Sequence, residues 1–170
     1  VPLAAGCSML VIGEPGSEEK CRDAVKKLEE IGVDGVWETD YQTAVSLAAG
    51  KRASGRPFSL AFLPYKLLRF DRTLTGERLR RDLGGDTLLL LGLKPDEQEL
   101  FDEIKQKGFS HTISLPLFRM SLYRKITGML GQRESLSGGL AGELKDVRLL
   151  LVEDNAVNLE IAVEMLSGLM

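Results

Sequence analysis

The sequence predicts an α/β protein whose parallel β-sheet is covered by helices on both faces. Between residues 9 and 130, short apolar runs alternate with longer segments of helical period, and this pairing occurs five times. The run FSLAFLP (residues 58–64) is apolar without alternation, as expected of a strand buried on both faces. Several helical segments end at glycine, which readily adopts the left-handed conformation that stops a helix.

The first two strand-helix units occupy residues 9–55. Residues 9–13 predict a strand, and residues 17–32 predict a helix that stops at Gly32. Its apolar positions at helical spacing are Cys21, Ala24, Val25, Leu28 and Ile31. Residues 35–39 predict the second strand, and residues 41–55 predict the second helix.

Three further units follow in residues 58–130. The expected strands are residues 58–64, 86–93 and 111–117. The segment 65–85 is expected to be a loop and then an amphipathic helix, and the later helices are expected in residues 95–108 and 119–130. Five such units favour a flavodoxin-like, doubly wound (βα)5 sheet with strand order 2-1-3-4-5. A larger dinucleotide-binding domain is disfavoured because no G-x-G-x-x-G follows the first strand.

The pattern restarts after a break. Residues 131–146 are rich in glycine, serine and charge, which is typical of a flexible linker after a first domain of residues 1–130. Residues 147–170 then predict one strand and one helix, so they are expected to open a second domain that is truncated here. The chain is therefore expected to be part of a longer protein. We expect this orphan unit to fray, to pack on the first domain, or to pair with another chain by dimerisation or strand exchange.

Composition excludes several classes of function. The net charge is −3 with both signs interspersed, so no basic surface is expected to bind nucleic acid. No apolar run is long enough to span a bilayer, and no direct membrane contact is expected. Cys7 and Cys21 form no metal or redox motif, which favours a reducing compartment and a cytoplasmic location.

Two carboxylates, Glu153 and Asp154, stand at the tip of the last predicted strand. Adjacent carboxylates repel each other, and a divalent cation such as Mg²⁺ relieves that repulsion. The same residues also suit an acidic helix N-terminus with Asp154 or Asn155 as its cap. The residues alone leave both interpretations open.

The stretch LLLVEDNAVNLEIAVEML (residues 149–166) resembles the opening of receiver domains of two-component signalling proteins, especially those at the C-terminal end of hybrid histidine kinases. The resemblance implies that Glu153 and Asp154 hold Mg²⁺ beside an aspartate on the third strand, which accepts phosphate from a histidine. That third strand is not in this chain. Mg²⁺ is therefore expected only in a complete second receiver.

The first domain is similar to a receiver in its order of strands and helices, and its positions can be compared with the family pattern. After the first strand, where a receiver has an acidic pair, this chain has Gly13 and Glu14. At the end of the third strand, where a receiver has the phosphoacceptor aspartate, this chain has Pro64.

The remaining two positions depart from the pattern as well. Gly92 replaces the hydroxyl residue of the fourth strand, and Leu115 replaces the lysine that precedes Pro116 in the fifth. A site without acceptor, hydroxyl and ammonium cannot stabilise a phosphoryl transition state. The resemblance therefore implies a pseudo-receiver that has no cofactor or catalysis of its own.

Such a module is expected to act by protein–protein contact with the kinase core and receiver domains of the same or a partner signalling protein. The resemblance implies that the parent protein is a sensor histidine kinase. The sequence leaves open whether that parent is anchored in a membrane. One alternative is a small flavodoxin-like domain that binds a nucleotide or flavin at the GEPGS turn (residues 13–17), although the acidic side chains there oppose an anion. Another is a plain spacer.

Other residues that suggest phosphate chemistry have ordinary explanations. His111, the only histidine, is expected to be structural because it begins the fifth strand, far from the strand tips. Asp71 and Asp82 lie in arginine-rich sequence, where exposed ion pairs are expected.

Overall fold

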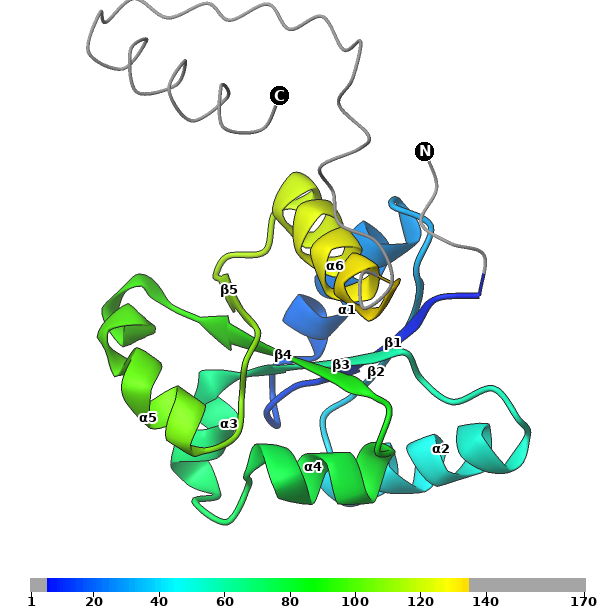
Figure 1. The fold of residues 1–170 in the computed structure, drawn as a ribbon, viewed down its shortest axis with the longest axis horizontal. Helices are drawn as coiled ribbons and strands as arrows, with labels where there is room; N and C mark the ends of the chain where they lie inside the picture. The colour runs from blue at the N-terminus through cyan, green and yellow to red at the C-terminus, as the bar shows by residue number, and fades with distance from the viewer. Residues whose placement is uncertain (1–5, 135–170) are drawn as a thin grey trace, which may run out of the picture. The chain divides into compact units, whose positions relative to one another are not determined.

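The computed structural model describes residues 6–134, in which strands and helices alternate (Figure 1). The strands are β1 (Ser8–Ile12), β2 (Asp34–Glu38), β3 (Leu60–Pro64), β4 (Leu88–Leu93) and β5 (Thr112–Ser114). The helices are α1 (Glu18–Glu29), α2 (Tyr41–Ala53), α3 (Tyr65–Phe70), α4 (Gly76–Leu83), the 3₁₀ helix η1 (Pro95–Leu100), α5 (Phe101–Gln106) and α6 (Arg119–Glu134).

The five strands form one parallel sheet in the order β2-β1-β3-β4-β5. Leu10 of β1 pairs with Ala61 of β3, and Ala61 pairs with Leu89 of β4, so the central strands share one apolar register. The predicted fold class and strand order are therefore confirmed.

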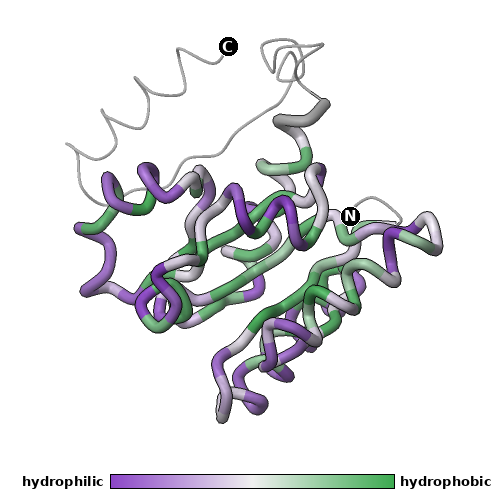
Figure 2. Tube along the Cα trace, turned by 90° about the horizontal axis from the view of Figure 1, so that it is seen from below, coloured by the Kyte–Doolittle hydropathy of each residue, from purple (hydrophilic) through white to green (hydrophobic). Residues whose placement is uncertain are grey.

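Successive side chains of a strand point to opposite faces of a sheet, and this sheet is buried on both. One face packs on α2, α3, α4 and α5 through a cluster that includes Leu10, Ala61 and Leu91. Helices α1 and α6 cover the other face (Figure 1). In Figure 2 the strands are mostly green, while purple residues lie on the helices and loops around them, so the core lies along the sheet.

Several predicted bounds were wrong, each for a local reason. The loop expected after β3 contains α3, because Tyr65 and Leu68 bury one face of this six-residue helix. The third strand-helix crossover therefore holds two short helices. The helix expected in residues 95–108 begins as the 3₁₀ helix η1 and becomes α-helical only at Phe101.

The last strand and helix also differ from the prediction. Strand β5 is shorter than residues 111–117, because Pro116 has no N–H to continue the ladder after Leu115 N–H donates to the Leu93 carbonyl (2.7 Å). Helix α6 continues to Glu134, past the predicted linker start at residue 131. Gly131 does not end the helix, since a helical glycine costs only about 1 kcal/mol relative to alanine.

The rest of the predicted linker, the predicted unit 147–170 and its residues Glu153 and Asp154 lie outside the described residues. Within residues 6–134, no helix combines the length and the apolar character needed to cross a bilayer.

A tight contact between the start of α4 and the turn that follows α5 provides a stability test. A Cβ at Gly76 would lie 2.3 Å from the carbonyl oxygen of Gly108, whereas a Cβ at Gly50 in α2 would meet nothing within 4 Å. We expect Gly76→Ala to lower the free energy of unfolding by about 1–3 kcal/mol through overpacking. Gly50→Ala should raise it by about 0.5–1 kcal/mol, because alanine restricts the unfolded chain.

Urea denaturation followed by circular dichroism measures both changes. Similar effects of the two substitutions would contradict this account of the α4 contact.

Candidate functional site

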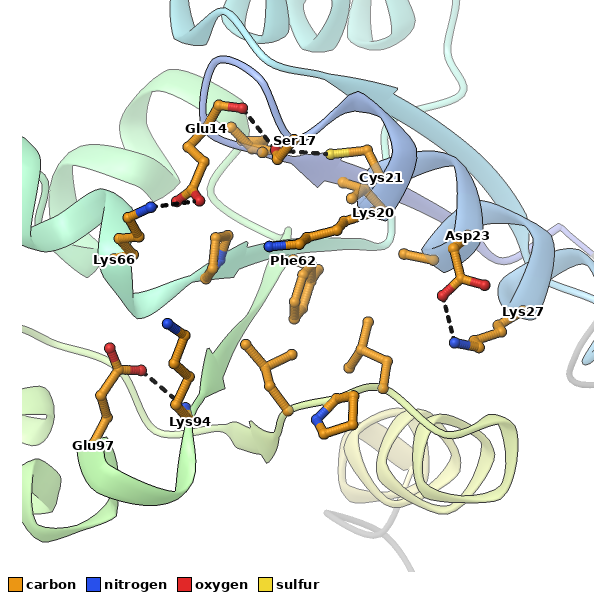
Figure 3. Close-up of a pocket in the computed structure, with 18 of the residues that line it drawn as sticks. Glu14, Ser17, Lys20, Cys21, Asp23, Lys27, Phe62, Lys66, Lys94 and Glu97 are labelled. Carbon is orange, nitrogen blue, oxygen red and sulfur yellow. Dashed lines mark hydrogen bonds and ion pairs between the residues drawn. The ribbon is translucent and has the colours of Figure 1, made fainter.

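A cavity of about 480 Å³ lies at the carboxyl ends of the strands, beside α1 (Figure 3). In doubly wound sheets this is the edge at which ligands bind. Five of the six positions singled out from the sequence line it: Gly13, Glu14, Pro64, Leu115 and Pro116. The sixth, Gly92, lies beneath the side chain of Phe62, which also lines the cavity.

Gly13 lies where the end of β1 meets the first turn of α1. A Cβ at this position would lie 2.3 Å from Cys21 Sγ and 2.5 Å from Ser17 Oγ. The Ser17 hydroxyl donates to the Glu14 carbonyl (2.7 Å) and lies 3.6 Å from Cys21 Sγ, which fixes this turn. The space that a second acidic side chain would need is therefore already filled.

Cys21 lines the cavity but is only 4% exposed. Burial raises the pKa of its thiol, although the hydrogen bond to Ser17 opposes this shift. Because the thiolate is the reactive form, Cys21 is a poor nucleophile, and it serves to pack α1 on the sheet.

Glu14, the one carboxylate at the tip of β1, is paired with a lysine. Lys66 of α3 places its Nζ 2.8 Å from Glu14 Oε1 and 5.6 Å from the centre of the Phe70 ring. The other carboxylate oxygen, Oε2, is buried and has no donor within the described part of the chain. The charge of Glu14 is thus balanced by a cation that belongs to the protein.

The neighbouring strand ends present apolar groups. Pro64 and Gly92 are register partners on β3 and β4. A Cβ at Gly92 would lie 2.8 Å from two atoms of the Phe62 ring and 3.2 Å from Leu115 Cδ2. Phe62 and Leu115 therefore occupy the space that a hydroxyl side chain at residue 92 would take, and they form an apolar floor.

Lysines surround this floor, and sequence reasoning missed them. Lys20 reaches in from α1 and Lys94 from the residue after β4, as Figure 3 shows. Neither ammonium pairs with a carboxylate among residues 6–134, whereas Lys27 pairs with Asp23. Lys66 lies two residues after the end of β3, and Lys94 lies one residue after the end of β4. Examination of the residues just after each predicted strand would therefore have identified both lysines.

The other acidic groups of the cavity are also engaged. Glu97 is 6% exposed, and its carboxylate accepts the backbone N–H of Lys94 (2.9 Å), which holds the turn into η1. Within the described residues, no group of three or more His, Cys, Asp or Glu side chains is placed to hold a metal ion.

The GEPGS turn is satisfied internally. The Gly16 N–H donates to Glu18 Oε1 (3.3 Å), and the Ser17 N–H donates to the Glu14 carbonyl (3.0 Å). A carboxylate of the protein itself therefore takes the place that a ligand phosphate would need at this turn, which disfavours nucleotide or flavin binding there.

The two aspartates after β3 form ion pairs, as predicted. Arg78 lies 3.7 Å from Asp71 and 3.6 Å from Asp82, and the Tyr41 hydroxyl donates to Asp82 (2.8 Å). Hydrogen bonds from Thr73 lower the pKa of Asp71. These carboxylates belong to a surface network, and neither lines the cavity.

His111 lies just before β5, and its carbonyl accepts the Leu91 N–H (3.0 Å). Partial burial lowers the pKa of its imidazole, and the charges of Lys125 and Arg80 lower it further. It does not line the cavity, in keeping with the structural role expected of it.

These features define a doubly wound α/β domain with an open cavity at its ligand-binding edge and no carboxylate at the end of β3. Comparison with solved structures identifies the fold as that of response regulator receiver domains. No protein-family profile matches the sequence, and no curated protein matches it.

Two receiver structures illustrate the likeness. A response regulator receiver domain protein from Clostridium thermocellum is 12% identical with a TM-score of 0.57, over 76% of this chain and 98% of that one. A response regulator from Thermotoga maritima is 17% identical with a TM-score of 0.58, over 74% and 98%. Full-length ShkA in complex with AMPPNP is 20% identical with a TM-score of 0.54, over 95% of this chain and 31% of that one.

The contact between Phe62 and Gly92 can be tested with a double-mutant cycle. We expect Gly92→Ala to lower the free energy of unfolding by about 1–3 kcal/mol, because the new methyl group collides with the ring. In a Phe62→Leu background the same substitution should cost less, giving a coupling energy of about 1 kcal/mol or more.

The measurement is urea denaturation of the four proteins of the cycle. Gly85→Ala is the matched control, since its Cβ would meet nothing within 4 Å and should show no coupling to Phe62. Strict additivity of the Gly92 and Phe62 changes would contradict the proposed packing.

Proposed function

We propose that this chain is a signal-transduction module of a hybrid sensor histidine kinase, and that its first domain is a receiver-like domain that cannot be phosphorylated. The observation that carries the proposal is the chemistry of the strand ends. Pro64 stands where the receiver family has its acceptor, and Phe62 and Leu115 fill the space above Gly92.

Phosphorylation of this domain would require groups that its strand ends do not present. An aspartyl phosphate requires a carboxylate oxygen at the end of β3 as nucleophile, and a proline ring offers none. The transferred group also requires cations and hydrogen-bond donors around its equatorial oxygens. Among the positions compared in the first domain, Glu14 is the one carboxylate that matches the family pattern, and its charge is already balanced by Lys66.

Without covalent chemistry, the domain is proposed to act by contact. It would bind the kinase core and a receiver domain of the same or a partner protein, and would shift the populations of their arrangements. Apolar side chains are available for such contacts, because Phe101 is 49% exposed, Phe118 62% and Met120 55%. These residues flank the starts of α5 and α6.

The remainder of the chain fits the same proposal. Residues 147–170 would open a complete receiver in the parent protein, where Glu153 and Asp154 would hold Mg²⁺. The likeness to full-length ShkA spans 95% of this chain and 31% of that one, which supports a place within a longer protein. The module is proposed to be cytoplasmic and to bind neither nucleic acid nor membrane.

Treatment of the chain with Mg²⁺ and acetyl phosphate tests the absence of phosphorylation. We expect no acyl phosphate in peptides from residues 1–130, because β3 ends at Pro64, which offers no carboxylate to accept the phosphoryl group. Intact mass and peptide mass spectrometry provide the readout, with an active receiver domain as positive control. A stoichiometric aspartyl or glutamyl phosphate within residues 1–130 would overturn the proposal.

A deletion separates a contact module from a plain spacer. In the parent kinase, replacing residues 6–130 with a flexible segment that spans the same distance should change phosphotransfer output, because the contact surface is lost. A combined Phe101→Ser, Phe118→Ser and Met120→Ser variant, which leaves the core intact, should change the output in the same direction. Unchanged output in the deletion would show that the domain only separates its neighbours.

A further inference from the structure

We propose that the cavity at the carboxyl ends of the strands binds a small organic anion, a carboxylate or phosphate group attached to a flat apolar body. This proposal goes beyond the function above, which assigns contacts with proteins to the domain and no ligand to the cavity.

The size and lining of the cavity suit a small molecule. Its volume of about 480 Å³ falls within the range of roughly 300–1,000 Å³ that is typical of ligand pockets. The phenyl ring of Phe62 and the side chain of Leu115 form the floor, and the rings of Pro64 and Pro116 add apolar wall. Flat apolar surfaces of this kind favour a ring system, which would be removed from water on binding.

The charges around the cavity do not balance. The lining residues carry four ammonium groups (Lys20, Lys27, Lys66 and Lys94) and three carboxylates (Glu14, Asp23 and Glu97). The local charge is therefore +1, in a chain whose net charge is −3. An excess of cations around an apolar floor favours an anionic ligand.

The pairing within the cavity shows which cations remain available. Lys66 is bound to Glu14, and Lys27 is bound to Asp23. The carboxylate of Glu97 is buried and accepts the backbone N–H of Lys94. Among the described residues, no ammonium group forms an ion pair with this carboxylate. The ammonium groups without a carboxylate partner in the described structure are those of Lys20 and Lys94.

These two groups come from different elements and extend into one cavity. Lys20 belongs to α1 and Lys94 follows β4, and Figure 3 shows their Nζ atoms on either side of the space next to Phe62. An anion between them would be contacted from two sides, while its apolar body lies on Phe62. A metal cation is disfavoured, because the lysines repel it and Glu14 is already paired.

The test is a fluorescence titration of the full chain with 8-anilinonaphthalene-1-sulfonate, a flat aromatic anion. We expect saturable one-to-one binding that the double variant Lys20→Gln/Lys94→Gln weakens by roughly tenfold or more, since each lysine contributes an attractive charge. The matched control is Lys26→Gln/Lys105→Gln, which removes two exposed lysines of α1 and α5 outside the cavity. It should bind the probe as the wild-type chain does.

Two further ligands distinguish the contribution of the ligand's negative charge from that of its apolar body. Neutral N-phenyl-1-naphthylamine should bind the pocket variant and the control variant equally, because it has no charge for the lysines. Inorganic phosphate alone should bind at least tenfold more weakly than the organic anion, because it has no apolar body to bury. Equal affinity of the sulfonate for the pocket and control variants would overturn the proposal, and so would the absence of saturable binding to the wild-type chain.

This result is independent of the phosphorylation experiment. A chain that stays unphosphorylated and shows no lysine-dependent probe binding would retain the proposed signalling function and lose the proposed ligand. Chemical-shift changes confined to the backbone amides of Lys20, Phe62 and Leu115 would locate the bound probe by a second method. Changes centred on the exposed Phe101 and Phe118 would place the probe elsewhere and overturn the assignment.

Discussion

The close packing of the Phe62 ring on Gly92 is the contact on which the candidate site depends. Adjacent parallel strands place these residues two positions apart along the sheet, since Phe62 pairs with Leu90 and Pro64 pairs with Gly92. The ring extends toward the strand ends and leaves no room for a side chain at residue 92. One aromatic residue thus excludes a side chain at residue 92 and contributes to the apolar floor of the cavity.

The polar groups around that floor are positioned by the first turns of α1 and η1. Ser17 and Cys21 pack α1 against Gly13, and Glu97 holds the turn that carries Lys94. The fold is that of receiver domains, and its strand ends present Pro64, Phe62 and Leu115 to the cavity. Two features recur along this edge: packed side chains fill the space next to Gly13 and Gly92, and the Glu14 carboxylate is paired with Lys66.

The sequence predicted the fold class, the strand order and the meeting of Gly13, Pro64 and Leu115 at one edge. These predictions succeeded because apolar runs and helix stops are local signals, and because parallel strands end on the same side of a sheet. Helix α3 was missed because a helix of six residues produces too short a periodic pattern. Lys94 directly follows β4 and could have been found from the sequence, whereas the position of Lys20 at the cavity depends on how α1 packs on the sheet.

The pairing of Glu14 with Lys66 determines how the charge at the tip of β1 depends on ions in solution. An exchangeable ion leaves its site when its concentration in the cell falls, whereas the Lys66 ammonium is covalently attached to α3 and stays beside the carboxylate. The Glu14 carboxylate at the tip of β1 is therefore paired with a cation of the chain itself, which does not depend on the magnesium supply. Under the proposed function, a partner that docks at this edge would meet a carboxylate that Lys66 already neutralises, with or without magnesium.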